Sequence, residues 1–252
     1  MDENKEVVKE EKSKVKEPFS KKSFYAFALI FGVVVILAFF SYAKLTGLSI
    51  LSSPELVFEI DFDNPQTLEK LEMNNLSLEK DPVFGNVGVF DGIKFMYSTE
   101  KLKLDPKKGF NVLVNAYVED NEDKNHMGIF STGSEDGTKG FRLKYRDFED
   151  FDRLYIQTGG VTDYATFENN SCYQRWCNYA FTFKPNGKVL IYLNGDFIKE
   201  VKVNPEIKVN DFVNVGNTIS INKDRFLGKI ADVRVYEGVL SKDEMKELSK
   251  TS

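Results

Sequence analysis

Two kinds of hydrophobic pattern divide this chain. Residues 24–43 form an uncharged run of 20 residues, FYAFALIFGVVVILAFFSYA, which is apolar on every face of a helix. A helix of that length spans about 30 Å, the thickness of the hydrocarbon core of a bilayer. After Pro54 the apolar residues alternate with polar ones, which is typical of strands with one buried face. The pattern therefore predicts a transmembrane helix over residues 23–43 and a β domain over residues 55–252.

The flanking charges predict how the apolar run is oriented. Seven lysines precede it, and an excess of lysine marks the cytoplasmic side even where acidic residues are interleaved. Thirteen of residues 1–22 are charged, so we expect a disordered cytoplasmic tail. Residues 44–54 form a short tether, and the β domain is then extracytoplasmic, displayed from the cell membrane by a single pass.

The alternative for this segment is a secretory signal peptide. The residues Ser41-Tyr42-Ala43 have the small-x-small pattern of a cleavage site after Ala43. Signal peptides usually have an apolar region of about 7–15 residues and a short charged leader. Because this run and its leader are both longer, the sequence favours an uncleaved anchor.

Short alternating segments continue through the rest of the chain. In the first one, Phe58, Ile60 and Phe62 face one way and acidic residues face the other. The full set of expected strands is 57–63, 87–97 with a break at Asp91-Gly92, 101–104, 112–118, 127–130, 140–145, 154–157, 179–183, 188–193, 197–203, 212–215, 219–221 and 229–236. Many short strands without intervening helical patterns predict an all-β, antiparallel, two-sheet sandwich.

Two local motifs are specific. Asn194-Gly195 joins two strand-like segments, and both residue types tolerate positive φ, so the pair predicts a type I′ hairpin turn. Ser241 and Glu244 have the spacing of a capping box. A short C-terminal helix should follow Ser241 and pack Leu240, Met245 and Leu248 on the sandwich.

Five motifs, in the same order and over roughly residues 54–248, resemble the laminin-G-like members of the concanavalin-A-like jelly rolls. They are Phe84-Gly85 with Val89–Gly92, Val112–Val118 with Tyr117 where a Trp is common, Trp176 with Ala180–Phe183, Tyr192–Gly195, and Phe226–Ile230 with Val233–Tyr236 and Leu240-Ser241. The resemblance implies a jelly-roll topology for the predicted sandwich.

The last of these strands departs from the family pattern. The family commonly has Asp directly after the Ile, where an acid helps to hold a structural calcium in related jelly rolls. This chain has Ala231 there, and the acid is Asp232, one position later. One step along a strand points a side chain to the opposite face, so Asp232 could serve only if the local backbone differs. The candidate calcium ligands are Asp91, by its place in the motif, and Asp232.

Charge and motifs exclude several functions. From Leu45 onward, 26 Lys and Arg residues face 33 Asp and Glu residues, a net charge of −7. An acidic domain argues against a nucleic-acid partner, which requires clustered cations. No Glu-x-Asp-x-x-Glu string of the β-glucan hydrolases and no Gly-x-Ser-x-Gly occurs. We therefore expect a protein that is not an enzyme.

Cys172 and Cys177, the two cysteines of the chain, enclose four residues just before an expected strand. Thiols outside the cytoplasm tend to oxidise, so we expect a local disulfide. Two thiols alone do not make a metal site. The one histidine, His126, is expected in a surface loop.

Exposed aromatic side chains are the candidate ligand contacts. Tyr145, Tyr155, Tyr164 and Tyr173 lie in or beside an irregular stretch, whereas Trp176 is expected in the core. The predicted function is a membrane-anchored, non-catalytic binding or adhesion module for a glycan, an envelope polymer or a cell-surface protein. The alternatives are a structural envelope subunit that self-associates as a homo-oligomer, and a glycan-active hydrolase.

Overall fold

The computed structural model describes residues 53–250 and Val33, with gaps at 120–125, 133–139, 149–150, 159, 169–171, 208, 210 and 219–223. The predicted cytoplasmic tail, membrane span and most of the tether lie outside the described residues. In the part of the chain that is described, no helix is long and apolar enough to cross a membrane. Residues 53–252 form one compact unit.

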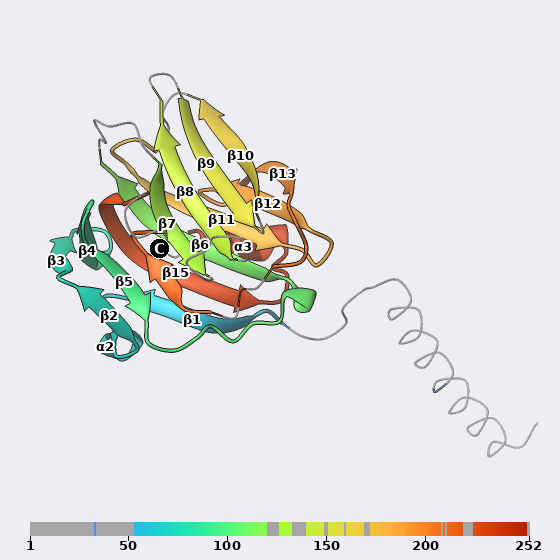
Figure 1. The fold of residues 1–252 in the computed structure, drawn as a ribbon, viewed down its shortest axis with the longest axis horizontal. Helices are drawn as coiled ribbons and strands as arrows, with labels where there is room; N and C mark the ends of the chain where they lie inside the picture. The colour runs from blue at the N-terminus through green and yellow to red at the C-terminus, as the bar shows by residue number, and fades with distance from the viewer. Residues whose placement is uncertain are drawn as a thin grey trace, which may run out of the picture. The chain divides into compact units, whose positions relative to one another are not determined.

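This unit is a two-layer antiparallel sandwich (Figure 1). The first sheet, here sheet A, has the order β13 (Asp196–Lys202), β12 (Lys188–Leu193), β11 (Trp176–Phe183), β6 (Phe110–Val118), β15 (Leu227–Glu237), β4 (Gly85–Asp91) and β3 (Ser77–Asp81), with β1 (Glu55–Asp61) also paired to β15. The second, sheet B, has the order β10 (Val161–Glu168), β9 (Phe151–Thr158), β8 (Phe141–Asp147), β7 (Met127–Thr132), β14 (Val213–Val215), β5 (Phe95–Ser98) and β2 (Leu71–Asn74). The helical elements are α2 (Pro65–Leu68), the 3-10 turn η1 (Pro106–Lys108) and α3 (Lys242–Leu248). The predicted fold class is confirmed.

The core lies between the two sheets and follows from the alternation within each strand. Phe110 and Phe181 of sheet A meet Phe141 of sheet B, with ring centroids 5.5 and 6.2 Å from that of Phe141. All three side chains are buried. Burying one such ring contributes about 1.5–3 kcal/mol.

The outer face of sheet A is closed by α3. Its capping box is present, since the Ser241 hydroxyl accepts from the Glu244 amide and the Glu244 carboxylate accepts from the Ser241 amide. Leu240 and Met245 are buried against a small cluster that includes Leu113. The predicted helix, its cap and its packing are confirmed.

The Asn194-Gly195 turn is also confirmed. Both residues have positive φ, 51° and 80°, as a type I′ turn requires. The turn joins β12 to β13, and the Asn194 side-chain oxygen accepts from the Asn178 amide at 2.8 Å.

Some of the strand predictions are wrong. Residues 101–104 form no strand: Leu102 and Leu104 are buried, but the segment runs as a loop. The alternation of apolar and polar residues there reflects burial of the two leucines, although the segment forms no strand. Three strands, β2, β3 and β10, were not predicted, and the expected strand 219–221 lies outside the described residues.

A β-bulge shapes β15. Ile230 pairs with Ala116, but Asp232 pairs with Asn115, so Ala231 is an extra residue in the ladder. Because of the bulge, the side chain of Asp232 points to the face to which residue 231 would point in a regular strand. It also marks a change of partner on one edge of β15, from β4 before the bulge to β1 after it.

A small polar cluster lies inside the sandwich near the ends of β8 and β9. Tyr145, Asp147 and Asp152 point inward, and Tyr145 packs edge to face on Tyr179 with centroids 6.1 Å apart. Tyr145 has no exposed area, so the prediction that it contacts a ligand is wrong: alternation places it among core residues. Burial is the main cause of a raised pKa at Asp152, although the Cys172 amide donates to its carboxylate at 3.2 Å.

The capping box gives one prediction. Ser241→Ala removes the acceptor for the Glu244 amide, and we expect the free energy of unfolding to fall by about 1 kcal/mol. Chemical denaturation measures it. Ser241→Thr keeps the hydroxyl and is the control; an unchanged stability for Ser241→Ala would contradict the role of the cap.

The buried acid gives a prediction about pH. A carboxyl with a raised folded pKa binds its proton more tightly in the folded chain. Its contribution to stability is full below the unfolded pKa of about 3.9 and is lost as the pH rises through the folded pKa. Between about pH 4 and pH 7, urea unfolding should therefore show a smaller loss of stability for Asp152→Asn than for the wild type. Asp196→Asn, at a side chain that is 74% exposed, is the control. Equal pH slopes for the wild type and Asp152→Asn would disprove this.

Candidate ligand-binding face

Sheet B presents a face of aromatic and cationic side chains to the outside. Along β8, Leu143 and Tyr145 point inward, so Lys144 and Arg146 point outward. The same alternation in β9 and β10 turns Arg153, Tyr155 and Tyr164 outward. We call these five residues the β8–β10 face.

Two tyrosines lie side by side on this face. Tyr155 pairs directly with Tyr164 in the ladder, and their ring centroids are 5.7 Å apart. Tyr164 is 39% exposed, and Tyr155 is half-buried. His126 packs edge to face on Tyr155 at 4.6 Å. The structure thus brings together two of the four tyrosines expected to contact a ligand, and we call them the tyrosine pair.

Next to the tyrosine pair, Arg146 and Arg153 lie directly opposite each other in the ladder. Like charges in such positions repel. Aromatic rings partly offset this: Arg146 lies 4.7 Å from the centroid of Phe148, and Arg153 lies 4.9 Å from that of Phe151 and 4.5 Å from that of Tyr164. We call Arg146 and Arg153 the arginine pair.

The ion pairs that the described residues form on and beside this face do not involve the arginine pair. Lys144 pairs with Asp224 at 2.6 Å, and Lys199 of neighbouring β13 pairs with Asp163 at 3.7 Å. Within the described residues, the Nε atoms of Arg146 and Arg153 are buried without a hydrogen-bond partner. The face therefore carries positive charge that its own described acids do not neutralise.

His126 is neutral at ordinary pH. Its pKa is lowered, first by burial and further by the charges of Lys144 and Arg146, against an opposing effect of Asp224. It therefore adds an aromatic surface beside Tyr155 and no charge. Its contact with this face was not predicted from the sequence.

Tyr173 lies apart from the tyrosine pair. It follows Cys172 and forms an isolated bridge with Val118 at the end of β6. The predicted disulfide between Cys172 and Cys177 is present, with Cα atoms 5.7 Å apart. It closes the turn that leads into β11.

Trp176 is not a core residue, contrary to the prediction. It points to the outer face of sheet A, where its ring lies 4.5 Å from Phe84 and 5.8 Å from Tyr117. Its Nε1 donates to Asp81 at 3.1 Å. The residue thus fastens the early Phe84 loop to β6 and β11.

The two candidate calcium ligands are far apart. Asp91 pairs with Leu227 in the ladder, five positions along β15 from Asp232, which is about 16 Å at strand spacing. Asp91 accepts from the amides of Ile93 and Lys94. Among the described residues, no group of three His, Cys, Asp or Glu side chains could hold a metal ion.

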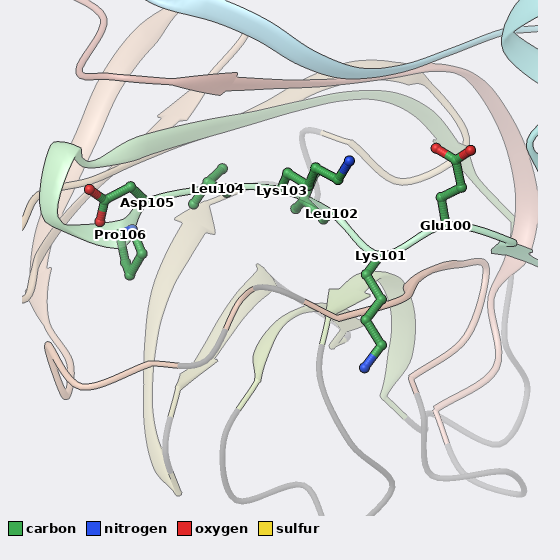
Figure 2. Close-up of a pocket in the computed structure, with 7 residues that line it drawn as sticks. All are labelled: Glu100, Lys101, Leu102, Lys103, Leu104, Asp105 and Pro106. Atoms are coloured by element: carbon green, nitrogen blue, oxygen red, sulfur yellow. The ribbon is translucent and has the colours of Figure 1, made fainter.

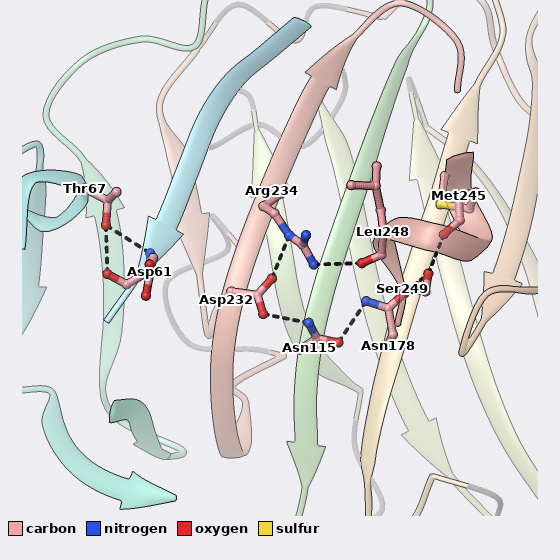
Figure 3. Close-up of polar contacts among 9 residues, drawn as sticks. All are labelled: Asp61, Thr67, Asn115, Asn178, Asp232, Arg234, Met245, Leu248 and Ser249. Atoms are coloured by element: carbon pink, nitrogen blue, oxygen red, sulfur yellow. Dashed lines mark hydrogen bonds and ion pairs between the residues drawn. The ribbon is translucent and has the colours of Figure 1, made fainter. Parts of the chain in front are cut away.

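Asp232 belongs to a polar network on the outer face of sheet A (Figure 3). It accepts from Asn115 at 2.6 Å and from Arg234 at 3.1 Å. Burial is the main cause of its raised pKa, which Arg234 partly counteracts. Asn178 and Ser249 continue the network to the end of α3. Because these partners are protein groups, the network fastens α3 to the sheet.

An open groove borders the loop that was expected to be a strand. Figure 2 shows its lining, which is the single segment Glu100–Pro106. Lys101 pairs with Asp211 at 3.5 Å, and the buried Leu102 and Leu104 hold the segment in place. The groove gathers no set of chemically convergent side chains, unlike the β8–β10 face.

The sequence contains a pattern that indicates the cationic part of the face. Arg142, Lys144 and Arg146 recur with a period of two between apolar residues. Arg153 joins them only through the hairpin register of β8 and β9.

Sequence and structure comparisons agree on the fold. No protein of curated function matches the chain in sequence. Domain 4 of AbnA, a GH43 extracellular arabinanase from Geobacillus stearothermophilus, in complex with arabinotriose, is similar in structure: the TM-score is 0.61 and the identity 17%, covering 79% of this chain and 100% of that domain.

The binding domains of botulinum neurotoxin serotypes G and D are also similar. Each gives a TM-score of 0.58, with 12% and 14% identity, over 78% and 79% of this chain. The chain spans about half the length of these toxin domains, 51% and 52%. At such identities the likeness concerns the fold alone.

The profile of one family matches residues 99–246, which is more than half of the chain. This range runs from the end of β5 into α3 and contains four of the five sequence motifs in whole or large part. The chain therefore belongs to the concanavalin A-like lectin/glucanases superfamily, as a laminin-G-like jelly roll.

Proposed function

We propose that this protein is a non-catalytic binding module, held at the cell membrane by residues 23–43, whose jelly roll binds a glycan outside the cytoplasm. The observation that carries the proposal is the tyrosine pair, two neighbouring rings on an open sheet face. Aromatic rings that stay partly exposed offer a flat apolar surface with a polar edge, which suits the mixed surface of a sugar.

The carboxylates of the described residues support a non-catalytic role. Glycoside hydrolysis requires two carboxyl groups facing each other across a cleft that substrate can enter. Asp147 and Asp152 are neighbours but buried in the core. Asp61 and Asp232 pair across β1 and β15, yet Asp232 is bound by Asn115 and Arg234.

The similar structures are consistent with binding. One is an arabinanase domain in complex with arabinotriose, and others are toxin binding domains. A cell-surface protein or a second copy of the chain is the alternative partner.

The tyrosine pair can be tested directly. The full chain is measured against a panel of glycans and envelope polymers, and we expect Tyr155→Ala and Tyr164→Ala each to weaken binding about tenfold, roughly 1.4 kcal/mol. Tyr97→Ala is the matched control because Tyr97 faces outward on the same sheet, about 19 Å away at four strand spacings. Binding that survives both changes, or no glycan binding by a folded chain, would rule out the proposed site.

Membrane anchoring is a separate prediction. The full chain should stay in the membrane fraction after high-salt and alkaline washes, because a run of 20 apolar residues partitions into lipid. Deleting residues 24–43 should release it. A mature chain that begins at Lys44 would identify the segment as a cleaved signal peptide instead.

A further inference from the structure

The β8–β10 face has the opposite charge to the domain that carries it. Residues 45–252 have a net charge of −7. Yet this face turns Lys144, Arg146 and Arg153 outward on two neighbouring strands. Lys144 is neutralised by Asp224, and within the described part of the chain neither arginine of the pair forms an ion pair, which leaves a local excess of positive charge there.

The geometry of the arginine pair is suited to binding an anion. Stacking on Phe148, Phe151 and Tyr164 restricts where each guanidinium can lie. Opposed like charges cost stability in the free protein, and a bound anion would relieve that repulsion. Guanidinium groups bind carboxylate and sulfate-like oxygens through paired hydrogen bonds.

We infer that the β8–β10 face binds an anionic glycan, one that carries carboxylate or sulfate groups. The arginine pair binds the anionic group, and the tyrosine pair contacts the adjoining sugar ring. This inference rests on the proposed function and specifies the ligand class of the same site.

The size and surroundings of the cationic patch favour a glycan over nucleic acid. Nucleic-acid binding requires many phosphate contacts spread over a basic surface. Here two cations that have no acidic partner among the described residues lie beside two tyrosines in an acidic domain. An anionic glycan that has one or two charges per sugar unit, and an apolar ring face between them, matches that arrangement.

The test uses three polymers with one backbone: dextran, carboxymethyl dextran and dextran sulfate. Binding of the full chain to each is measured at low and at high salt. We expect at least one charged polymer to bind about tenfold more tightly than dextran, with an affinity that falls as salt rises. The two charged polymers distinguish carboxylate from sulfate recognition.

Site variants locate the effect. Arg146→Gln and Arg153→Gln should each weaken binding to the charged polymer about tenfold. Lys80→Gln removes the same charge from exposed β3 of the other sheet and should change nothing. Arg153→Lys keeps the charge and should recover part of the lost affinity, which separates a binding role from a folding defect.

Three results would overturn the inference. Equal, salt-independent binding of all three dextrans would remove the charge requirement but keep the proposed glycan-binding function. Equal loss of affinity in Lys80→Gln would show a general charge effect. Single-stranded poly(dT) binding as tightly as the charged dextrans would point to any polyanion, whereas failure of the whole glycan panel would refute the proposed function itself.

Discussion

Burial of one face of each sheet is the constraint on which the rest of this structure depends. In β6, β8, β9 and β11 every second side chain enters the layer between the sheets, where Phe110, Phe141 and Phe181 meet. Because those residues point inward, their neighbours along each strand point outward. The outward residues therefore do not have to fit the apolar core, and their chemistry differs between the two sheets.

Sheet A and sheet B use their outer faces for different purposes. Sheet A covers its own with α3 and with the network from Asp232 to Ser249, so polar groups there satisfy one another. The β8–β10 face of sheet B has no such cover among the described residues. Within that part of the chain the arginine pair has no acidic partner, and Tyr164 is exposed, which favours this side for recognition.

Residues whose environment is decided locally could be predicted from the sequence. Asn194-Gly195 and the Ser241–Glu244 box carry their geometry in adjacent residues, and both form as expected. The long alternations of β6, β11 and β15 predicted the core strands, and the five motifs predicted the jelly roll. The short local disulfide followed from position as well.

The features that depend on pairing between distant segments could not be predicted in this way. Alternation in Leu102 and Leu104 reflects burial of a loop, and nothing local distinguishes it from a strand. Tyr145 lies on the inner face of β8 with Leu143, whereas Tyr155 lies on the outer face of β9 between Leu154 and Ile156; which face of each strand turns inward depends on how the two sheets pack. Opposition of Arg146 to Arg153 likewise appears only once β8 and β9 are aligned.

The bulge at Ala231 has a mechanical consequence. It allows the last six residues of β15 to pair with β1, and Glu55 then lies opposite Glu237, with Pro54 against Gly238. The start of β1 and the end of β15 thus lie together at one end of this ladder. Tension between Pro54 and Gly238 would open the ladder one bonded pair at a time, beginning at Glu55, rather than load all pairs together. The strand that follows the tether would separate from β15 first, and the buried Ile60 of β1 would leave the core with it.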